Sequence, residues 1–346
     1  MSSNHRCIEG QISGLATGFS NSCSVIKETL LVCRRLYHTT VHFLIIWIQR
    51  EASILRPSIC GQIIHALLIL GCLAFLSTHS FAQAQVLSVD GILDGSFHSM
   101  YNLQFDQAKQ KAEQAKAFDK DDPMPWVAQA CAVLFHEFDR LHILRSEMFS
   151  SDDTFDARPA YNWLPDAKKQ FDDQLGHAEK MAHDRLNKNK NDVKALFAMV
   201  LINGLQADGA ALITKKNMTA LSYIKTSTSY AERLLALSPG SYDAYVATGM
   251  GKYIIGGKAA PVRWILRLGG LKGDQEQGVK ELTLVAEKGR YLAPFARILL
   301  AFNDLRLKNK AAARQKLASL HDQFPGNPLF VQEIAKLDNH SMGPGQ

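Results

Sequence analysis

From Gln85 onward the sequence predicts an all-α fold, built as a solenoid of antiparallel helix pairs. Alanine-rich amphipathic runs recur through this region, and sustained alternation of apolar and polar residues, which is typical of a half-buried strand, is not found. Short breaks rich in Asn, Asp, Pro and Gly separate these runs at residues 121–123, 189–192, 238–240 and 324–328. Helical runs divided at such intervals predict internal repeats of a helix pair.

A secretory signal is predicted at residues 55–84, ahead of the helical region. Gln62–Leu76 is an apolar run of signal-peptide length, Arg56 supplies positive charge before it, and a polar, small-residue stretch ending in Ala-x-Ala follows it. This pattern predicts cleavage between Ala84 and Gln85 and a periplasmic or secreted protein. The alternative is an uncleaved segment that anchors the protein in a membrane, although the run is shorter than the roughly 20 apolar residues of a spanning helix.

Residues 1–54 precede this signal, whereas signal peptides begin at the N-terminus of a chain. The stretch has no sustained helical periodicity, and no methionine occurs between Met1 and Met100. We therefore interpret it as a misassigned or disordered extension, with translation starting at a non-Met codon such as that of Leu55.

Cysteine usage predicts that the helical region is stable through core packing alone. Cys131 is the single cysteine after residue 85, so this region holds no internal disulfide. The residue stands in an apolar helical run that includes Val133 and Leu134. We expect a buried structural thiol there rather than a nucleophile, because no activating base is evident nearby in the sequence.

Charge is polarised along the region after the signal. Between Gln85 and Met250 there are 18 Lys and Arg against 22 Asp and Glu, and between Gly251 and Gln346 there are 15 against 8. The near balance of the whole region argues against nucleic acid as a partner. The basic C-terminal part favours a protein or peptide partner of acidic character.

Small residues recur at the offsets of a repeated helix pair. They are needed where two helices cross closely, while a large apolar residue fills the groove between neighbouring units. On these residues the chain resembles the tetratricopeptide repeat (TPR) family, whose units are about 34 residues long, over most of residues 90–338. Phe149–Pro165 and Gly256–Gly273 interrupt the register, and we interpret them as two insertions. The signature residues are Phe105, Ala108, Ala115, Trp126, Ala130, Pro239, Tyr245, Gly249, Ala301, Ala313 and Pro325.

One stretch, Arg263–Asp274 followed by Gly278 and Leu282, carries a closer resemblance. It is similar to the Leu-Gly-Phe-x-Gly-Asp-x3-Gly-x3-Leu element of a divergent eukaryotic TPR family, which comprises the tetratricopeptide repeat domain 39 proteins and the fungal inclusion-body clearance protein. The ending Phe324–Phe330 fits that family as well, whereas Leu271 stands where the family has an aromatic residue. The resemblance implies a TPR-like fold and a scaffold role, without indicating a partner.

Motifs for catalysis or metal binding are weak. Gly251–Lys258 departs from the phosphate-binding loop, since Lys252 stands where glycine is required and Ala259 where the Mg²⁺-binding Ser or Thr would be. His136 and His142 are six residues apart, whereas two metal ligands on one helix face are three or four apart. We therefore expect a protein that is not an enzyme and uses no cofactor or metal.

The leading prediction for function is a protein–protein interaction scaffold of the cell envelope. Basic and aromatic side chains gather around the second insertion, and such a set can grip an acidic peptide. The candidate contact residues are Lys252, Tyr253, Lys258, Arg263, Trp264 and Arg267. The alternative is a helical binder of a small ligand, lipid or glycan, or an enzyme, with a pocket formed by the insertions and lined by His136, Asp139 and the region of Asp172.

Overall fold

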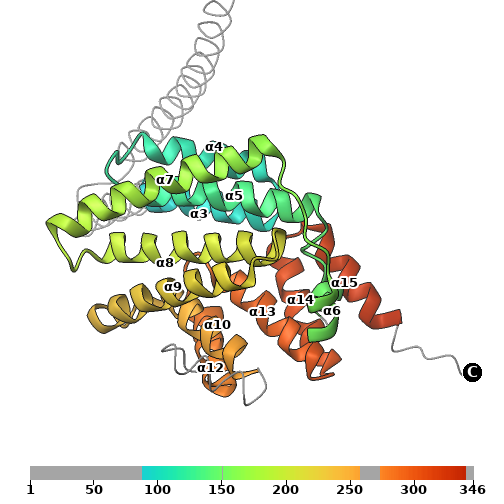
Figure 1. Ribbon diagram of the computed structural model, residues 1–346. Coiled ribbons are helices and arrows are strands. Elements are labelled where there is room, and N and C mark those ends of the chain that lie inside the picture. Colours follow the sequence, from blue (N-terminus) through green and yellow to red (C-terminus); the bar gives the residue numbers. More distant parts are fainter. Residues whose placement is uncertain (1–87, 150, 258–272, 340–346) are drawn as a thin grey trace, which may run out of the picture. The chain divides into compact units, whose positions relative to one another are not determined.

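The computed structural model describes residues 88–339, except residue 150 and residues 258–272 (Figure 1). The predicted extension at 1–54 and the predicted signal segment at 55–84 lie outside the described residues. So do four of the candidate contact residues, namely Lys258, Arg263, Trp264 and Arg267. The described part contains twelve α-helices and no strand. The prediction of an all-α fold is confirmed.

Each long helix packs against the helix before it and the helix after it in the chain, as the order of colours in Figure 1 shows. A short helix, α6 (Asp152–Ala157), lies between α5 and α7, within the segment that the sequence marks as the first insertion. The long helices are α3 (Val89–Tyr101), α4 (Phe105–Lys116), α5 (Met124–Arg140), α7 (Pro165–Lys188), α8 (Val193–Asp208), α9 (Asn217–Leu237), α10 (Tyr245–Gly256), α12 (Gln275–Lys288), α13 (Ala293–Arg306), α14 (Lys310–Gln323) and α15 (Pro328–Asn339).

Local sequence signals set several helix ends. Ser88, Asp192, Asp274 and Asn309 stand just before α3, α8, α12 and α14, and the side chain of each accepts a hydrogen bond from the backbone N–H three residues on, at 2.9–3.2 Å. Such N-caps satisfy N–H groups that have no partner inside the helix. One of these caps, Asp192, ends the polar break at residues 189–192 that the sequence shows.

The small residues of the repeat signature stand at helix contacts. Its five alanines have no exposed surface, and Phe105 and Gly249 are buried as well. Trp126 and Tyr245 are half-buried, and the two prolines are exposed in turns. The alanines are Ala108, Ala115, Ala130, Ala301 and Ala313, and the prolines are Pro239 and Pro325.

Two glycines bring α10 and α12 into close contact. A Cβ atom on Gly278 would lie 2.7 Å from the backbone oxygen of Gly249 and 2.7 Å from the backbone nitrogen of Tyr253. The same crossing is held by Glu281 of α12, whose carboxylate pairs with Lys252 of α10. Only residues without a Cβ atom permit this approach of the two backbones.

One carboxylate fixes the turn between α12 and α13. Asp243, in the short 3₁₀ helix Tyr242–Ala244, accepts hydrogen bonds from the backbone N–H groups of Arg290, Tyr291 and Leu292 at 3.1, 3.1 and 3.0 Å. Gly289 precedes them, and a Cβ atom there would lie 2.6 Å from the carboxylate. These contacts therefore fix the position of the turn relative to α10.

This turn holds α3, the first described helix. Arg290 donates to both carboxylate oxygens of Asp94 at 2.9 and 2.8 Å, and the hydroxyl of Tyr101 donates to the backbone oxygen of Tyr291 at 2.9 Å. The ring of Phe97 stacks on Tyr291 at a centroid distance of 4.8 Å. Segments about 190 residues apart are thus in contact, and α3, α5, α8, α9, α10 and α13 border a common interior space.

Gly278→Ala is expected to destabilise the protein by about 1–3 kcal/mol, because the added methyl group has to displace backbone atoms of α10. Gly176→Ala is the matched control. Gly176 is exposed on α7 with open space where its Cβ would be, so alanine there is expected to stabilise by up to about 1 kcal/mol through helix propensity. Urea unfolding measures both changes. Equal effects would contradict the close crossing of α10 and α12.

Candidate functional site

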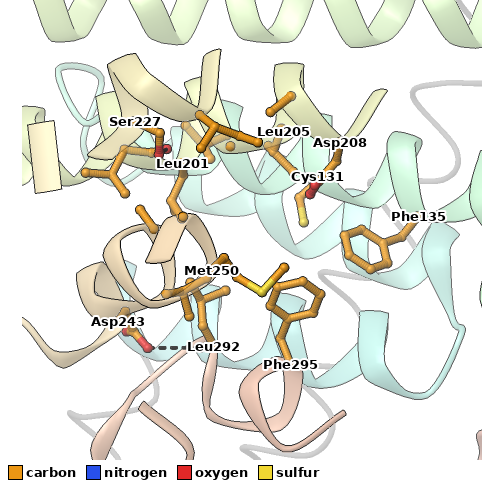
Figure 2. Close-up of a pocket in the computed structure, with 18 of the residues that line it drawn as sticks. Cys131, Phe135, Leu201, Leu205, Asp208, Ser227, Asp243, Met250, Leu292 and Phe295 are labelled. Carbon is orange, nitrogen blue, oxygen red and sulfur yellow. Dashed lines mark hydrogen bonds between the residues drawn. The ribbon is translucent and has the colours of Figure 1, made fainter. Parts of the chain in front are cut away.

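A cavity of about 160 Å³ lies among α3, α5, α8, α9, α10 and α13 (Figure 2). Its wall is mainly apolar. Phe135 of α5, Leu201 and Leu205 of α8, Met250 of α10 and Phe295 of α13 face the space from different sides. These side chains offer no hydrogen-bonding partner to a polar group on the wall.

Asp208, the last residue of α8, lies on this wall. No residue that the structure describes donates a hydrogen bond to its carboxylate or forms an ion pair with it. Burial raises the pKa of Asp208 to about 7, because an apolar environment disfavours the charged form. The side chain keeps an intermediate exposure, and it borders the cavity.

The other hydroxyl and carboxyl groups on the wall have partners. The hydroxyl of Tyr101 donates to Tyr291, and the hydroxyl of Ser227 donates to the backbone oxygen of Val200 at 2.8 Å. Asp243 accepts the three N–H groups of the turn, and Figure 2 shows its bond to Leu292. Burial raises the pKa of Asp243 while these bonds act against the rise. Unlike these three groups, the carboxylate of Asp208 has no hydrogen bond to a described residue that would offset the cost of its apolar surroundings.

Cys131 lies next to Asp208 on the wall. Its thiol is free and buried, so the prediction of a buried thiol is confirmed. Burial, and then the nearby Asp208 carboxylate, raise the pKa of Cys131 to about 12. A thiol that stays protonated is a poor nucleophile. Cys131 therefore contributes a weakly polar contact to the wall.

The first insertion braces the end of α8 that carries Asp208. The chain continues after this residue as a π-helix, Gly209–Ile213. Buried Arg158 donates to the backbone oxygen of Ala211 at 2.7 Å, and the backbone N–H of Tyr161 donates to the backbone oxygen of Ile213 at 2.7 Å. The segment between α5 and α7 thus supplies hydrogen-bond donors to the π-helix that follows Asp208 in the chain.

Asp208 did have a signal in the sequence. It is the single carboxylate within the apolar stretch Val193–Ile213. By length and composition this stretch is the one candidate membrane span among the described residues, and 56% of it is buried against other helices. A core helix of a folded domain has the same composition, so the observation is weak evidence for a membrane span. A lone acidic residue in such a stretch marks a polar point inside an apolar core.

Of the predicted contact residues, the structure describes Lys252 and Tyr253. Lys252 pairs with the buried carboxylate of Glu281, which also accepts a hydrogen bond from Thr248 at 2.7 Å. Tyr253 is half-buried, and burial raises its pKa. Both side chains thus belong to the contact between α10 and α12. The other four candidate residues lie outside the described part.

A second, more open pocket is lined by residues before and within the first predicted insertion, namely His142, Arg145, Glu147, Met148, Asp153, Thr154, Ala157 and Arg158. His136 is exposed and stacks on Phe105, and Asp172 is exposed and paired with Lys168 one helical turn away. Asp139 is half-buried, and none of these three acidic or histidine side chains lines the cavity. These three residues line neither pocket, and residues 258–272 of the second predicted insertion lie outside the described part.

Among the described residues no group of three or more His, Cys, Asp or Glu side chains is placed to hold a metal ion. The two carboxyl groups on the wall come from different elements and have different surroundings. The arrangement is therefore that of an apolar pocket with one uncompensated acidic group.

No protein-family model matches the chain, and none of the curated proteins compared with it is significantly similar.

Asp208→Asn is expected to change how stability depends on pH. The folded-state pKa of about 7 lies above the value of about 3.9 expected in the unfolded chain, so the folded protein holds the proton more tightly. The contribution of Asp208 to stability is therefore lost as pH rises from about 4 to about 7, and it levels off above that range. Relative to the parent protein, the variant should gain about 2–4 kcal/mol between pH 4 and pH 8. Urea unfolding at each pH measures this, and a constant difference would contradict the uncompensated carboxyl.

Proposed function

We propose that the helical unit is a binding protein for a small apolar ligand, with the cavity as its binding site. The observation that carries the proposal is an apolar space of about 160 Å³ between packed helices. Protein interiors are close-packed, and voids larger than a water molecule are few. The space is partly open to solvent, so a ligand can reach it. A ligand that fills it recovers that packing.

The volume limits the ligand to a small molecule. An engineered apolar cavity of about 150 Å³ in another protein stays dry and binds benzene. A ligand of roughly six to ten non-hydrogen atoms is the matching size. The aromatic side chains Phe97, Phe135 and Phe295 on the wall favour an aromatic or branched aliphatic body.

Binding fits the wall better than catalysis does. A nucleophile has to be activated by a base or by a lowered pKa. The thiol of Cys131 has a raised pKa, and the hydroxyl of Ser227 is committed to a backbone oxygen. These groups support the proposal of a protein that is not an enzyme and needs no cofactor.

The proposed architecture is a TPR-like helical repeat. Successive helices in contact and fully buried alanines at the signature positions support it. The proposed location is the periplasm or the cell exterior, which rests on the apolar run and the Ala-x-Ala pattern before Gln85. A membrane-anchored form is the alternative, and it differs only in whether the segment is cleaved.

A scaffold that binds an acidic protein or peptide is the second candidate, favoured by the basic and aromatic sequence around residues 258–267. Replacement of Lys258, Arg263 and Arg267 by Glu is then expected to abolish partner capture from the native envelope fraction without lowering the melting temperature. Capture measured by pull-down and mass spectrometry checks this. Unchanged capture would reject the placement of the contact surface.

Gly204→Leu is expected to close the cavity without destabilising the protein. Gly204 lines the cavity from α8, and a Cβ atom there would meet open space. Leucine also has a higher helix propensity than glycine, by up to about 1 kcal/mol. Benzene at twenty times its Kd should stabilise the parent by about 1.8 kcal/mol and the variant by nothing.

The measurement is thermal unfolding with and without benzene. Gly176→Ala is the control, because it changes an exposed glycine of α7 far from the wall residues and should keep the response. A parent protein that shows no benzene-dependent stabilisation would contradict the proposed function.

A further inference from the structure

We propose that the ligand of the cavity is a small primary amine, whose ammonium group pairs with Asp208 while its apolar body fills the rest of the space. This inference rests on the proposed function and adds the chemical class of the ligand.

The first observation is the unpartnered carboxyl group. Tyr101, Ser227 and Asp243 also line the cavity, and each is hydrogen-bonded to backbone groups of the protein. The carboxylate of Asp208 receives nothing from the residues that the structure describes. Since the side chain of Asp208 keeps an intermediate exposure and lines the cavity, its carboxylate is open to a partner that enters the cavity from outside.

The second observation is the sign of the charge. The described residues that line the wall include two carboxyl groups, Asp208 and Asp243, and no Lys, Arg or His. An anionic ligand would meet only repulsion there. A cation would form a charge-assisted hydrogen bond with a carboxylate, which is roughly twice as strong as a bond between neutral groups. The wall therefore selects for positive charge.

The third observation is the position of the carboxyl at one side of the cavity. Its neighbour Cys131 is one helical turn before Phe135 on α5, so the two share a face of that helix. Figure 2 shows Asp208 beside Cys131 on one side and Met250 on the other, and the rings of Phe135 and Phe295 pack edge to face at a centroid distance of 6.2 Å. A ligand with one charged end and an apolar body matches this division.

Benzylamine and ethylbenzene make the decisive pair of probes, because they have the same shape and differ in the ammonium group. At pH 8 the parent protein should bind benzylamine at least tenfold more tightly than ethylbenzene. Asp208→Asn should lose that preference while its affinity for ethylbenzene stays within about twofold, which also shows that the variant is folded. Titration calorimetry measures both ligands on both proteins.

The pH profile gives a second readout. Benzylamine affinity of the parent should fall about tenfold for each pH unit below 7, since Asp208 must give up its proton to pair with the ammonium group. The other titratable groups on the wall are Cys131, Tyr101 and Asp243, and burial raises the pKa of each. They remain in Asp208→Asn, so a flat profile in that variant assigns the dependence to Asp208.

The outcomes separate this inference from the proposed function. If ethylbenzene binds and benzylamine binds no better, the amine class is overturned and the apolar site stands. Tighter binding of benzyl alcohol than of benzylamine would also overturn it, by showing that Asp208 acts as a neutral group. If neither benzylamine nor ethylbenzene binds, and Gly204→Leu behaves as the parent does, the proposed function itself is rejected.

Discussion

Three backbone N–H groups of one turn donate to the carboxylate of Asp243 at 3.0–3.1 Å, and this contact sets where the turn presents Tyr291. Tyr291 in turn accepts the hydroxyl of Tyr101 and stacks on Phe97, so the first described helix is held against a turn that follows it by about 190 residues. The hydrogen bonds that a carboxylate accepts from several N–H groups offset the free-energy cost of burying it. This contact joins α3 to the turn before α13, while α3 also packs against α4 and α5.

The cavity lies among helices that this contact between α3 and the turn before α13 brings together. Its two carboxyl groups show how strongly the surroundings of an aspartate determine its pKa. Asp243 is compensated by backbone donors and serves the architecture. Asp208 faces apolar side chains without a donor, and its pKa is raised to about 7. A folded sequence normally avoids such a conflict between burial and charge, and the places where it does not are most often functional. Because of this contrast, we place the charged group of the proposed ligand at Asp208 rather than at the more numerous charges on the helix surfaces.

Periodicity and breaks in the sequence were enough to predict the helices, because helix formation depends on residues three or four apart. The buried alanines at Ala108 and Ala301 followed from the same local spacing. The contact between α3 and the turn before α13 could not be predicted, because Asp94 and Arg290 are 196 residues apart and nothing local links them. The cavity could not be predicted for a related reason: it is formed by residues of six helices that only the three-dimensional packing brings together.

The segment that the sequence predicts to be the first insertion holds the chain beside the cavity. Arg158 and Tyr161 bond to carbonyl groups of the π-helix Gly209–Ile213, directly after Asp208. π-helices are rare and are frequently found at functional sites. The insertion therefore stabilises the one segment of α8 that carries an uncompensated carboxyl. The ligand that we propose would pair with Asp208 and stabilise the same segment from inside, so its binding and the folding of the protein would be linked through RT ln(1 + [L]/Kd).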